Sequence, residues 1–259
     1  MGIAIITGAS SGMGREFARQ LCFQNPAGER FDEFWLIARR RDRLEELAEK
    51  LPVPCRVMAL DLTAEESYDE FAKALSEAEP EVSLLLNASG YGKFFSTMDT
   101  SAEDVCGMID LNCKALVRLT QLTVPYMKPG SHIVELDSLS AFQPVPYINV
   151  YAASKAFVLS FSRALDAELK SAGIKVMALC PGWVKTEFFD RAEPNGRTEI
   201  TYFNKMFTPD YIVKTAIRDM YRGKKDVCVP GFSIKVQVLL TKLLPHRLVM
   251  KIWLRQQGK

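Results

Sequence analysis

The chain has very few of the residues on which most metal sites and hydrolytic triads depend. It contains only two histidines, His132 and His246, among 259 residues. Zinc sites are commonly built from histidine and cysteine, and a serine–histidine–aspartate triad needs a histidine beside its nucleophile. Both kinds of site are therefore disfavoured, and we expect no metal centre.

The cysteines show no metal-binding or redox spacing. They contain no CxxC pair and are scattered over Cys22, Cys55, Cys106, Cys113, Cys180 and Cys228. A chain of this length can bury a large apolar core without disulfide bonds. We therefore expect reduced thiols and a cytoplasmic protein.

An excess of charge and long apolar runs are also lacking. The formal net charge is +2, whereas proteins that bind nucleic acids usually show a marked basic excess. No apolar run approaches the roughly 20 residues of a transmembrane helix. The opening MGIAIITGAS lacks the basic leader of a signal peptide. We expect neither a nucleic-acid partner, nor a membrane span, nor a signal peptide.

What the sequence does contain is an alternation of short apolar runs and longer helical periodicities. Continuous apolar runs are typical of parallel strands that helices cover on both faces. The expected strands are Ile3–Thr7, Phe34–Ala38, Arg56–Leu60, Ser83–Leu86, His132–Leu136, Lys175–Leu179 and Asp226–Val229. The expected helices are Gly14–Cys22, Asp42–Lys50, Ala64–Ala78, Ala102–Tyr126, Val150–Ser171 and Pro209–Tyr221. This order predicts an α/β, doubly wound Rossmann fold with a seven-stranded parallel sheet flanked by helices.

The C-terminal tail differs in composition from the rest. We expect residues 1–231 to form a Rossmann-fold catalytic domain and residues 232–259 to form a helical extension of it. The tail carries lysines and arginines but no acidic residue, and Pro245 separates its two apolar segments. Two short amphipathic helices are therefore predicted. Such helices suit a membrane surface, or docking on the body of the protein where they would close the substrate pocket or an edge of the dimer. Their shortness favours docking.

A glycine-rich turn follows the first expected strand. In TGASSGMG, Gly8, Gly12 and Gly14 precede a helix. Glycines allow close backbone approach, and the N–H groups at a helix start attract a pyrophosphate. The spacing is GxxxGxG rather than the GxGxxG of other dinucleotide folds. The turn therefore indicates a dinucleotide site of a different local geometry.

Arginines follow the second expected strand. In dinucleotide folds an acidic residue here binds the ribose of NAD, whereas arginine accommodates the 2′-phosphate of NADP. Arg39 and Arg40 could be solvated charges of the next helix, but their place at a strand end favours phosphate binding. NADP(H) is therefore the preferred cofactor, with NAD(H) possible. Asp61, after the third strand, is placed to receive an adenine amino group.

From about Ile3 to Val229 the order of motifs resembles the short-chain dehydrogenase/reductase family, including its hydroxysteroid dehydrogenases and ketoacyl reductases. The resemblance rests on TGASSGMG, LLLNASG, DLNCKA, IVELDSLSA, NVYAASKAFV and CPGWVKTEF. LLLNASG departs from the family's NNAG segment, because Ala88 and Ser89 replace the usual Asn-Ala. The cofactor contacts that the resemblance implies are Gly8, Ser10, Ser11, Gly12, Met13, Gly14, Arg39, Arg40, Asp61, Leu62, Asn87, Ala88, Ser89, Tyr151, Lys155, Pro181, Gly182, Val184 and Thr186.

The resemblance also assigns roles to four polar residues. Tyr151 and Lys155 are one helical turn apart, a spacing that also occurs by chance. A nearby cation lowers the pKa of a phenol, which is ordinarily about 10. We predict that Tyr151 is the general acid in reduction, that Lys155 lowers its pKa and binds the nicotinamide ribose, and that Ser138 orients the substrate oxygen. Asn112 would hold a water in a proton relay.

The segment after the last motif, residues 187–207, is long and rich in aromatic residues. Ligands of this fold bind outside the carboxyl ends of the strands, where this segment would form a cover. With Ser138 and Tyr151, the expected substrate contacts are Phe188, Phe189 and Phe203. They suit a small apolar ketone, aldehyde or alcohol of steroid-like, acyl or aryl type. The same aromatics could simply pack the cover onto the domain.

Three functions remain open at this point. The favoured one is an NADP(H)-dependent oxidoreductase. The others are a catalytically silent NADP-binding regulator and a membrane-associated reductase of lipid ketones. The family resemblance also implies a homodimer or homotetramer, because long helices such as Ala102–Tyr126 and Val150–Ser171 pair between subunits.

Overall fold

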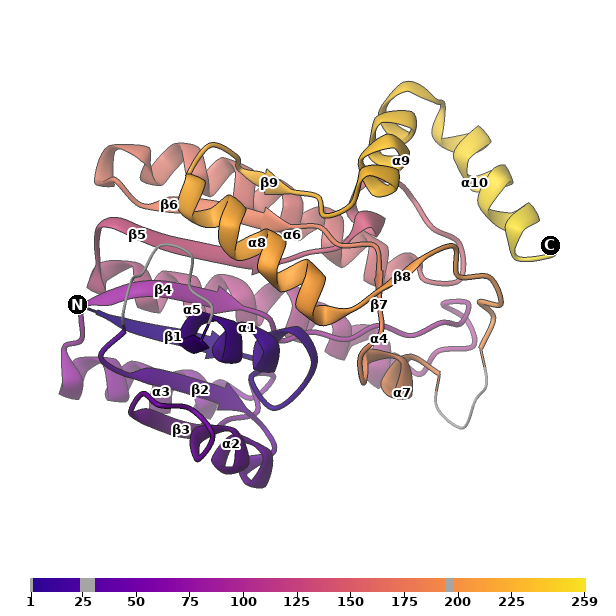
Figure 1. Cartoon of the computed structure of the whole chain (residues 1–259). Helices are drawn as coiled ribbons and strands as arrows, with labels where there is room; N and C mark the ends of the chain where they lie inside the picture. Colours follow the sequence, from indigo (N-terminus) through magenta and orange to yellow (C-terminus); the bar gives the residue numbers. More distant parts are fainter. Residues whose placement is uncertain (1, 24–30, 194–197) are drawn as a thin grey trace.

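A computed structural model of the chain describes residues 2–23, 31–193 and 198–259. It shows a parallel sheet of seven strands in the order β3-β2-β1-β4-β5-β6-β9, with helices on both faces (Figure 1). The strands are β1 Ile3–Thr7, β2 Phe34–Ala38, β3 Cys55–Ala59, β4 Val82–Asn87, β5 Met127–Leu136, β6 Lys175–Leu179 and β9 Val227–Cys228. The doubly wound fold expected from the sequence is confirmed.

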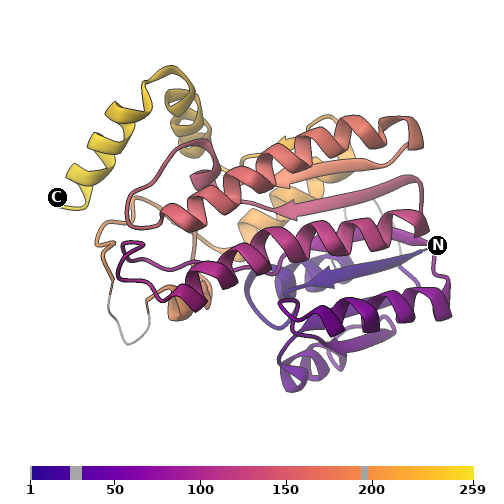
Figure 2. The ribbon, with the colours of Figure 1, turned by 180° about the vertical axis from the view of Figure 1, so that it is seen from behind.

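Strands β1 and β2 are buried along their whole length because helices cover both faces of the sheet. In β1, Ala4 pairs with Phe34 of β2 on one side and Leu84 of β4 on the other. One helical layer contains α1 Gly12–Phe23, α2 Arg41–Ala48 and α8 Pro209–Arg222, and the other contains α3 Glu65–Ala78, α5 Leu116–Thr123 and α6 Asn149–Glu168 (Figures 1 and 2). Two apolar clusters, one under each layer, therefore form the core.

The order of strands reverses direction between β1 and β4. β1 continues to β2 and β3 on one side, and β4 continues to β5, β6 and β9 on the other. Connections leaving the carboxyl ends of β1 and β4 diverge, and ligands of doubly wound folds bind in the crevice between them. The expected functional motifs follow these strand ends, so the fold brings them to one edge of the sheet.

The helix expected over Ala102–Tyr126 is confirmed in its bounds, but it is not a uniform α-helix. It consists of α4 Ala102–Ile109, a π-helical turn at Asp110–Ala115, α5, and a 3₁₀ turn at Val124–Tyr126. A π turn carries an extra residue, which re-aims the side chains that it contains and is frequent at functional sites. Here it contains Asn112, whose side chain is buried.

Some short elements were not expected. β7 Trp183–Val184 and β8 Met206–Phe207 pair with each other, and α7 is the five-residue helix Phe188–Ala192. These elements belong to the expected cover at residues 187–207 and to the loop before it. Residues 194–197 of that cover lie outside the described residues.

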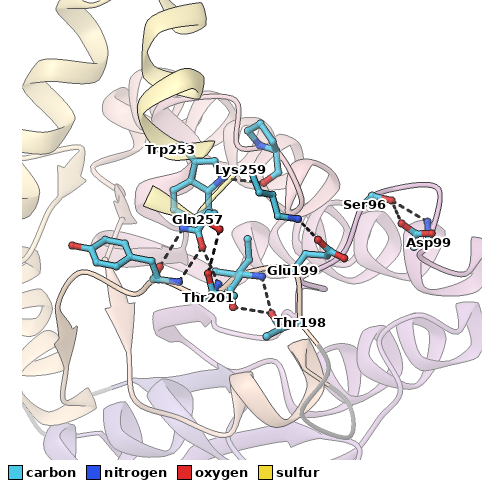
Figure 3. A network of polar contacts seen from close by, with 11 residues as sticks. Ser96, Asp99, Thr198, Glu199, Thr201, Trp253, Gln257 and Lys259 are labelled. Atoms are coloured by element: carbon cyan, nitrogen blue, oxygen red, sulfur yellow. Dashed lines mark hydrogen bonds and ion pairs between the residues drawn. The ribbon is translucent and has the colours of Figure 1, made fainter. Parts of the chain in front are cut away.

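The tail forms two helices, α9 Phe232–Leu243 and α10 His246–Gln256, on either side of Pro245, as expected. They dock on the body of the protein near the carboxyl edge of the sheet. The indole Nε1 of Trp253 donates to the carbonyl of Pro146 at 3.1 Å, and the Gln257 side chain accepts from the backbone N–H of Thr201 at 2.9 Å (Figure 3).

Candidate active site

A groove at the carboxyl edge contains most of the expected cofactor contacts. Gly8 has a φ of +66°, and a Cβ atom there would lie 2.7 Å from the carbonyl oxygen of Ala88. Thr7 Oγ1 accepts from the backbone N–H groups of Ala88 and Ser89, both at 3.0 Å, and so ties the turn to the loop after β4. The expected contacts that line the groove are Gly8, Ser10, Ser11, Gly12, Met13, Gly14, Arg39, Arg40, Asp61, Leu62, Ala88, Ser89 and Thr186. The backbone of the glycine turn, the N-terminus of α1 and these side chains suit the binding of a dinucleotide.

The two arginines after β2 have different surroundings. Arg40 donates to Ser10 Oγ at 3.2 Å and pairs with Glu187 at 2.9 Å. Glu187 also pairs with Arg43 at 3.7 Å. Arg39 and Asp61 both line the groove. Arg39 is therefore better placed than Arg40 to meet a ligand phosphate, since Arg40 is held by a carboxylate.

Arg191 is a groove residue that the sequence did not single out. Its guanidinium, on α7, lies 3.4 Å from the ring centroid of Tyr91. Burial, followed by the charge of Arg39, holds the pKa of Arg191 below its usual value. Two guanidiniums at one groove repel each other, and a bound phosphate relieves that repulsion. Arg191 lies only five residues after Thr186, but in the segment that we expected to cover the substrate, so no motif assigned it to the cofactor groove.

The predicted catalytic residues meet at the end of the groove beside an apolar cavity. Ser138 follows β5, whereas Tyr151 and Lys155 lie on α6, and all three line the cavity. Lys155 Nζ donates to the carbonyl oxygen of Leu136 at 2.6 Å and lies 5.7 Å from the ring centroid of Tyr151. The predicted trio is therefore assembled in space.

The electrostatics of Tyr151 differ from the expectation that Lys155 lowers its pKa. Burial raises the pKa of the phenol above its usual value, and a hydrogen bond with the Ser138 side chain opposes this rise. The ammonium of Lys155 lies over the ring and is committed to a carbonyl, and burial lowers its own pKa. Desolvation therefore outweighs the cation, and the phenol keeps its proton at neutral pH.

Asn112 is fixed in place by backbone and side-chain partners. Its Nδ2 donates to the carbonyl of Tyr91 at 2.9 Å and to Ser154 Oγ at 3.0 Å, and its Oδ1 accepts from the Tyr91 N–H at 3.0 Å. A Cβ atom on Gly90 would lie 2.9 Å from Asn112 Oδ1 and 3.6 Å from Lys155 Nζ. Gly90 thus keeps the space between the amide and the lysine open. The relay water stays a prediction.

Among the described residues, Asn87 is the expected cofactor contact that lines neither the groove nor the apolar cavity. It is buried between β4 and β5, where Nδ2 donates to Thr120 Oγ1 at 3.1 Å and to Glu135 Oε1 at 3.2 Å. Asn87 Oδ1 and Glu135 Oε2 have no hydrogen-bond partner among the described residues. Burial raises the pKa of Glu135 to about 8. A proton on Glu135 would allow its carboxyl group to donate to that amide oxygen.

This buried carboxyl should make stability fall as pH rises. The pKa of Glu135 in the folded protein, about 8, is above its ordinary value of 4.5. The protonated carboxyl therefore makes its full contribution to the free energy of unfolding below pH 4.5, and this contribution is lost as the pH approaches 8. Glu135→Gln stays neutral and can donate to Asn87, so it should raise the free energy of unfolding by about 2 kcal/mol or more at pH 8. Urea unfolding of both forms across this range checks the prediction. Glu66→Gln, a change at an exposed position, should leave the pH dependence of the free energy of unfolding unaltered. If Glu135→Gln shows the same pH dependence as the wild type, Glu135 is ionised in the folded protein.

The cavity beside Tyr151 is lined mainly by apolar and aromatic side chains. Of the predicted contacts, Pro181, Gly182, Val184, Phe188 and Phe189 line it together with the catalytic trio. Phe203 does not belong to the lining. It packs behind the wall, with its ring centroid 5.0 Å from that of Trp183 and 5.4 Å from that of Phe189. Some rings of the aromatic segment therefore line the cavity, and others hold the cover together.

The tail forms part of the cavity wall, which agrees with closing of the substrate pocket, one of the docking modes that the sequence left open. Gln237 of α9 and Trp253 and Gln256 of α10 line it, together with Asn204 of the cover. The Asn204 Nδ2 donates to Gln237 Oε1 at 3.3 Å. Neutral amides therefore surround part of an otherwise apolar cavity. The amphipathic pattern of the tail predicted its helices but did not decide between the substrate pocket and a dimer edge as the place where they dock.

Known proteins match this arrangement. A family model described as short chain dehydrogenase matches residues 2–196. Sulfoacetaldehyde reductase 2 of Chromohalobacter salexigens is 36% identical over 195 residues, 72% of this chain and 74% of that protein. A very-long-chain 3-oxoacyl-CoA reductase of Bos taurus is 31% identical over 259 residues, 96% of this chain and 77% of that protein. A solved short-chain dehydrogenase from Sphingobium yanoikuyae in complex with NADPH has 26% identity and a TM-score of 0.78, covering 94% of both chains.

Proposed function

Because this chain belongs to the short-chain dehydrogenase family of oxidoreductases, we propose that it interconverts an apolar ketone or aldehyde with its alcohol, using NADP(H) as the preferred cofactor. The observation that carries the proposal is the convergence of Ser138, Tyr151 and Lys155 where the dinucleotide groove meets the apolar cavity. Both spaces share lining residues such as Gly90 and Thr186. A nicotinamide in the groove would therefore face a substrate in the cavity.

The chain's own residues supply the proton chemistry. The bound cofactor supplies the hydride, and negative charge then develops on the substrate oxygen. The Tyr151 hydroxyl gives that oxygen its proton, and the Ser138 hydroxyl donates a hydrogen bond that orients it. Lys155 binds the nicotinamide ribose, and Asn112 holds the water that returns a proton towards Tyr151. The raised pKa of Tyr151 supports reduction, because the phenol stays protonated at neutral pH.

The lining supports a neutral, largely apolar substrate of steroid-like, acyl or aryl type. The charged side chains of the cavity lining are Asp137 and Lys155, and both lie beside the catalytic trio. A substrate with a remote sulfonate or phosphate would find no cation in this lining. The test is NADPH consumption with steroid ketones, aryl ketones and 3-oxoacyl thioesters. Failure to oxidise NADPH with any of them, despite tight NADPH binding, would favour the catalytically silent regulator.

The cofactor preference should depend on Arg39. In Arg39→Asp a phosphate partner becomes a carboxylate, which repels the 2′-phosphate and accepts from a ribose hydroxyl. The ratio of kcat/KM for NADPH to that for NADH should fall by about 100-fold or more, as expected from losing a charge-assisted hydrogen bond and gaining a repulsion. Arg41→Asp is the matched control, because Arg41 pairs with Glu45 on α2 outside the groove lining. An unchanged ratio in Arg39→Asp would assign the phosphate to Arg40 or Ser11.

Assembly into a homodimer or homotetramer remains part of the proposal. The rings of Phe157 and Phe161 stack on α6 at 6.1 Å, and Phe157 is exposed. Exposed aromatic pairs on a long helix suit an interface between copies.

A further inference from the structure

The tail carries large apolar side chains on the side that faces away from the protein. On α9, Phe232 is 83% exposed and Leu243 is 70% exposed. We define the outer tail face as Phe232, Val236, Leu239, Leu240, Leu243, Leu248 and Ile252. The α9 members recur at intervals of three or four residues, and Leu248 and Ile252 are one turn apart on α10. The exposed apolar residues therefore follow one side of each helix rather than being scattered.

The outer tail face is not needed to attach the tail. The opposite side of α9 buries Ile234 and Val238. A Cβ atom on Gly182 would lie 2.8 Å from Ile234 Cδ1, so α9 packs closely on the cofactor loop. At the other end, Trp253 and Gln257 anchor α10 (Figure 3). Because docking uses the inner side, some other contact must account for the apolar outer side.

The charge around the outer tail face selects the partner. From residue 231 onward the chain has no acidic residue, and the exposed cations of the two helices include Lys235, Arg247, Lys251 and Arg255. Lys242 is exposed as well, but its ammonium lies 5.6 Å from the ring centroid of Phe142. A second copy packed through the same face would bring these cations against their equivalents. An anionic lipid surface instead offers opposite charge to the cations and an apolar layer to the leucines.

We propose that the outer tail face binds the surface of a membrane that contains anionic lipids. The two helices project from the body at the carboxyl edge of the sheet, where a flat surface can reach them (Figures 1 and 2). In the described part of the chain, no helix has the length and apolarity to cross a bilayer, so the contact is interfacial. Both helices are short and amphipathic, which suits a position in the membrane–water interface.

Membrane contact would also place the cavity beside the lipid. Gln237, Trp253 and Gln256 belong to the same two helices as the outer tail face and line the cavity. An apolar ketone dissolved in the lipid would therefore have a short path to Tyr151. This second step rests on the proposed function, whereas the binding of the tail to lipid does not.

The test is sedimentation of the full-length protein with vesicles of phosphatidylcholine alone or mixed with phosphatidylglycerol. We expect the bound fraction to be at least fivefold higher on the mixed vesicles and to fall at high salt. Leu239→Ser/Leu243→Ser should lower binding at least fivefold, because it removes two exposed leucines without touching the inner side. Arg247→Glu/Lys251→Glu should also weaken it.

Matched controls separate the tail from general surface effects. Met98→Ser removes a 92% exposed apolar side chain elsewhere. Lys128→Glu/Lys175→Glu reverses two exposed lysines at the amino edge of the sheet. Both controls should bind as the wild type does. Circular dichroism and NADPH binding confirm that each variant is folded.

Several results would overturn the proposal. Full-length protein that stays in the supernatant with mixed vesicles contradicts it, as does equal binding by the leucine variant. If light scattering shows that Leu239→Ser/Leu243→Ser turns an oligomer into a monomer without any vesicle binding, the outer tail face is an interface between copies. Vesicle binding without NADPH turnover on any ketone would keep the membrane contact and reject the proposed function.

Discussion

Replacing Tyr151 with phenylalanine is expected to lower NADPH-dependent reduction by at least about 100-fold, the usual contribution of a positioned general acid. The substitution removes one hydroxyl and leaves the ring, which packs 5.4 Å from the ring of Phe188 by centroid distance. A Cβ atom on Gly92 would lie 2.9 Å from the Tyr151 ring, so the site fits an aromatic side chain closely. NADPH affinity should stay within about twofold, because the ring and Lys155 remain.

Steady-state kinetics and NADPH titration, measured separately, check this prediction. Tyr202→Phe is the matched control, because Tyr202 lines the same cavity but lies on the cover. Its kcat should change little. If Tyr151→Phe keeps more than about a hundredth of wild-type kcat, another group supplies the proton. Asp137 is then the first alternative, because it lines the cavity and burial raises its pKa to about 7.

Most of the fold could be predicted because its strands are buried on both faces. β1, β2 and β6 have the bounds that their continuous apolar runs predicted. β5 begins earlier than expected, at Met127, because its first residues include Lys128 and Gly130 and do not form an apolar run. The pair of strands β7 and β8 has two residues in each strand, too few for any periodicity.

The site was predictable where its residues lie inside ordered motifs. Ser138, Tyr151, Lys155 and the glycine turn converge as expected. What spacing could not show is the direction of a side chain or the balance between burial and charge. The π turn at Asp110–Ala115 and the inward side chain of Asn87 both depend on packing between elements distant in sequence.

Glu135 illustrates the same limit. In IVELDS it occupies a strand position like any other, and the sequence gives no sign that its carboxyl faces Asn87 and Thr120 in the core. Its burial follows from the helices that cover β5. Tertiary placement, rather than local pattern, therefore decides its protonation.

Replacing Lys155 with methionine is expected to damage turnover and cofactor binding together. The side chain is only 4% exposed, and its ammonium donates to the Leu136 carbonyl at 2.6 Å. We assign the same ammonium to the nicotinamide ribose, and a charge-assisted hydrogen bond contributes about 1.5–3 kcal/mol, or roughly 10- to 100-fold in affinity. The dissociation constant for NADPH should rise by about that factor. The kcat should fall at least about tenfold, because the ribose and Tyr151 lose a common partner.

A second consequence distinguishes this electrostatic role from simple packing. The carboxyl of Asp137 is buried, and the charge of Lys155 opposes the rise of its pKa. In Lys155→Met that pKa should climb above about 7, so the variant should lose stability as pH rises from 6 to 9. Lys155→Met/Asp137→Asn should recover stability across that range but not NADPH affinity.

The measurements are NADPH titration by fluorescence, kcat at saturating cofactor, and urea unfolding at several pH values. Lys114→Met serves as the control, because Lys114 is exposed and pairs with Glu65 at 3.2 Å away from the cavity. Wild-type NADPH affinity in Lys155→Met would remove the ribose-binding role. Asp137→Asn removes the unpaired carboxylate but does not restore the ammonium. Recovery of NADPH affinity in the double variant would therefore show that the unpaired Asp137 carboxylate, rather than the missing ammonium, weakens binding in Lys155→Met.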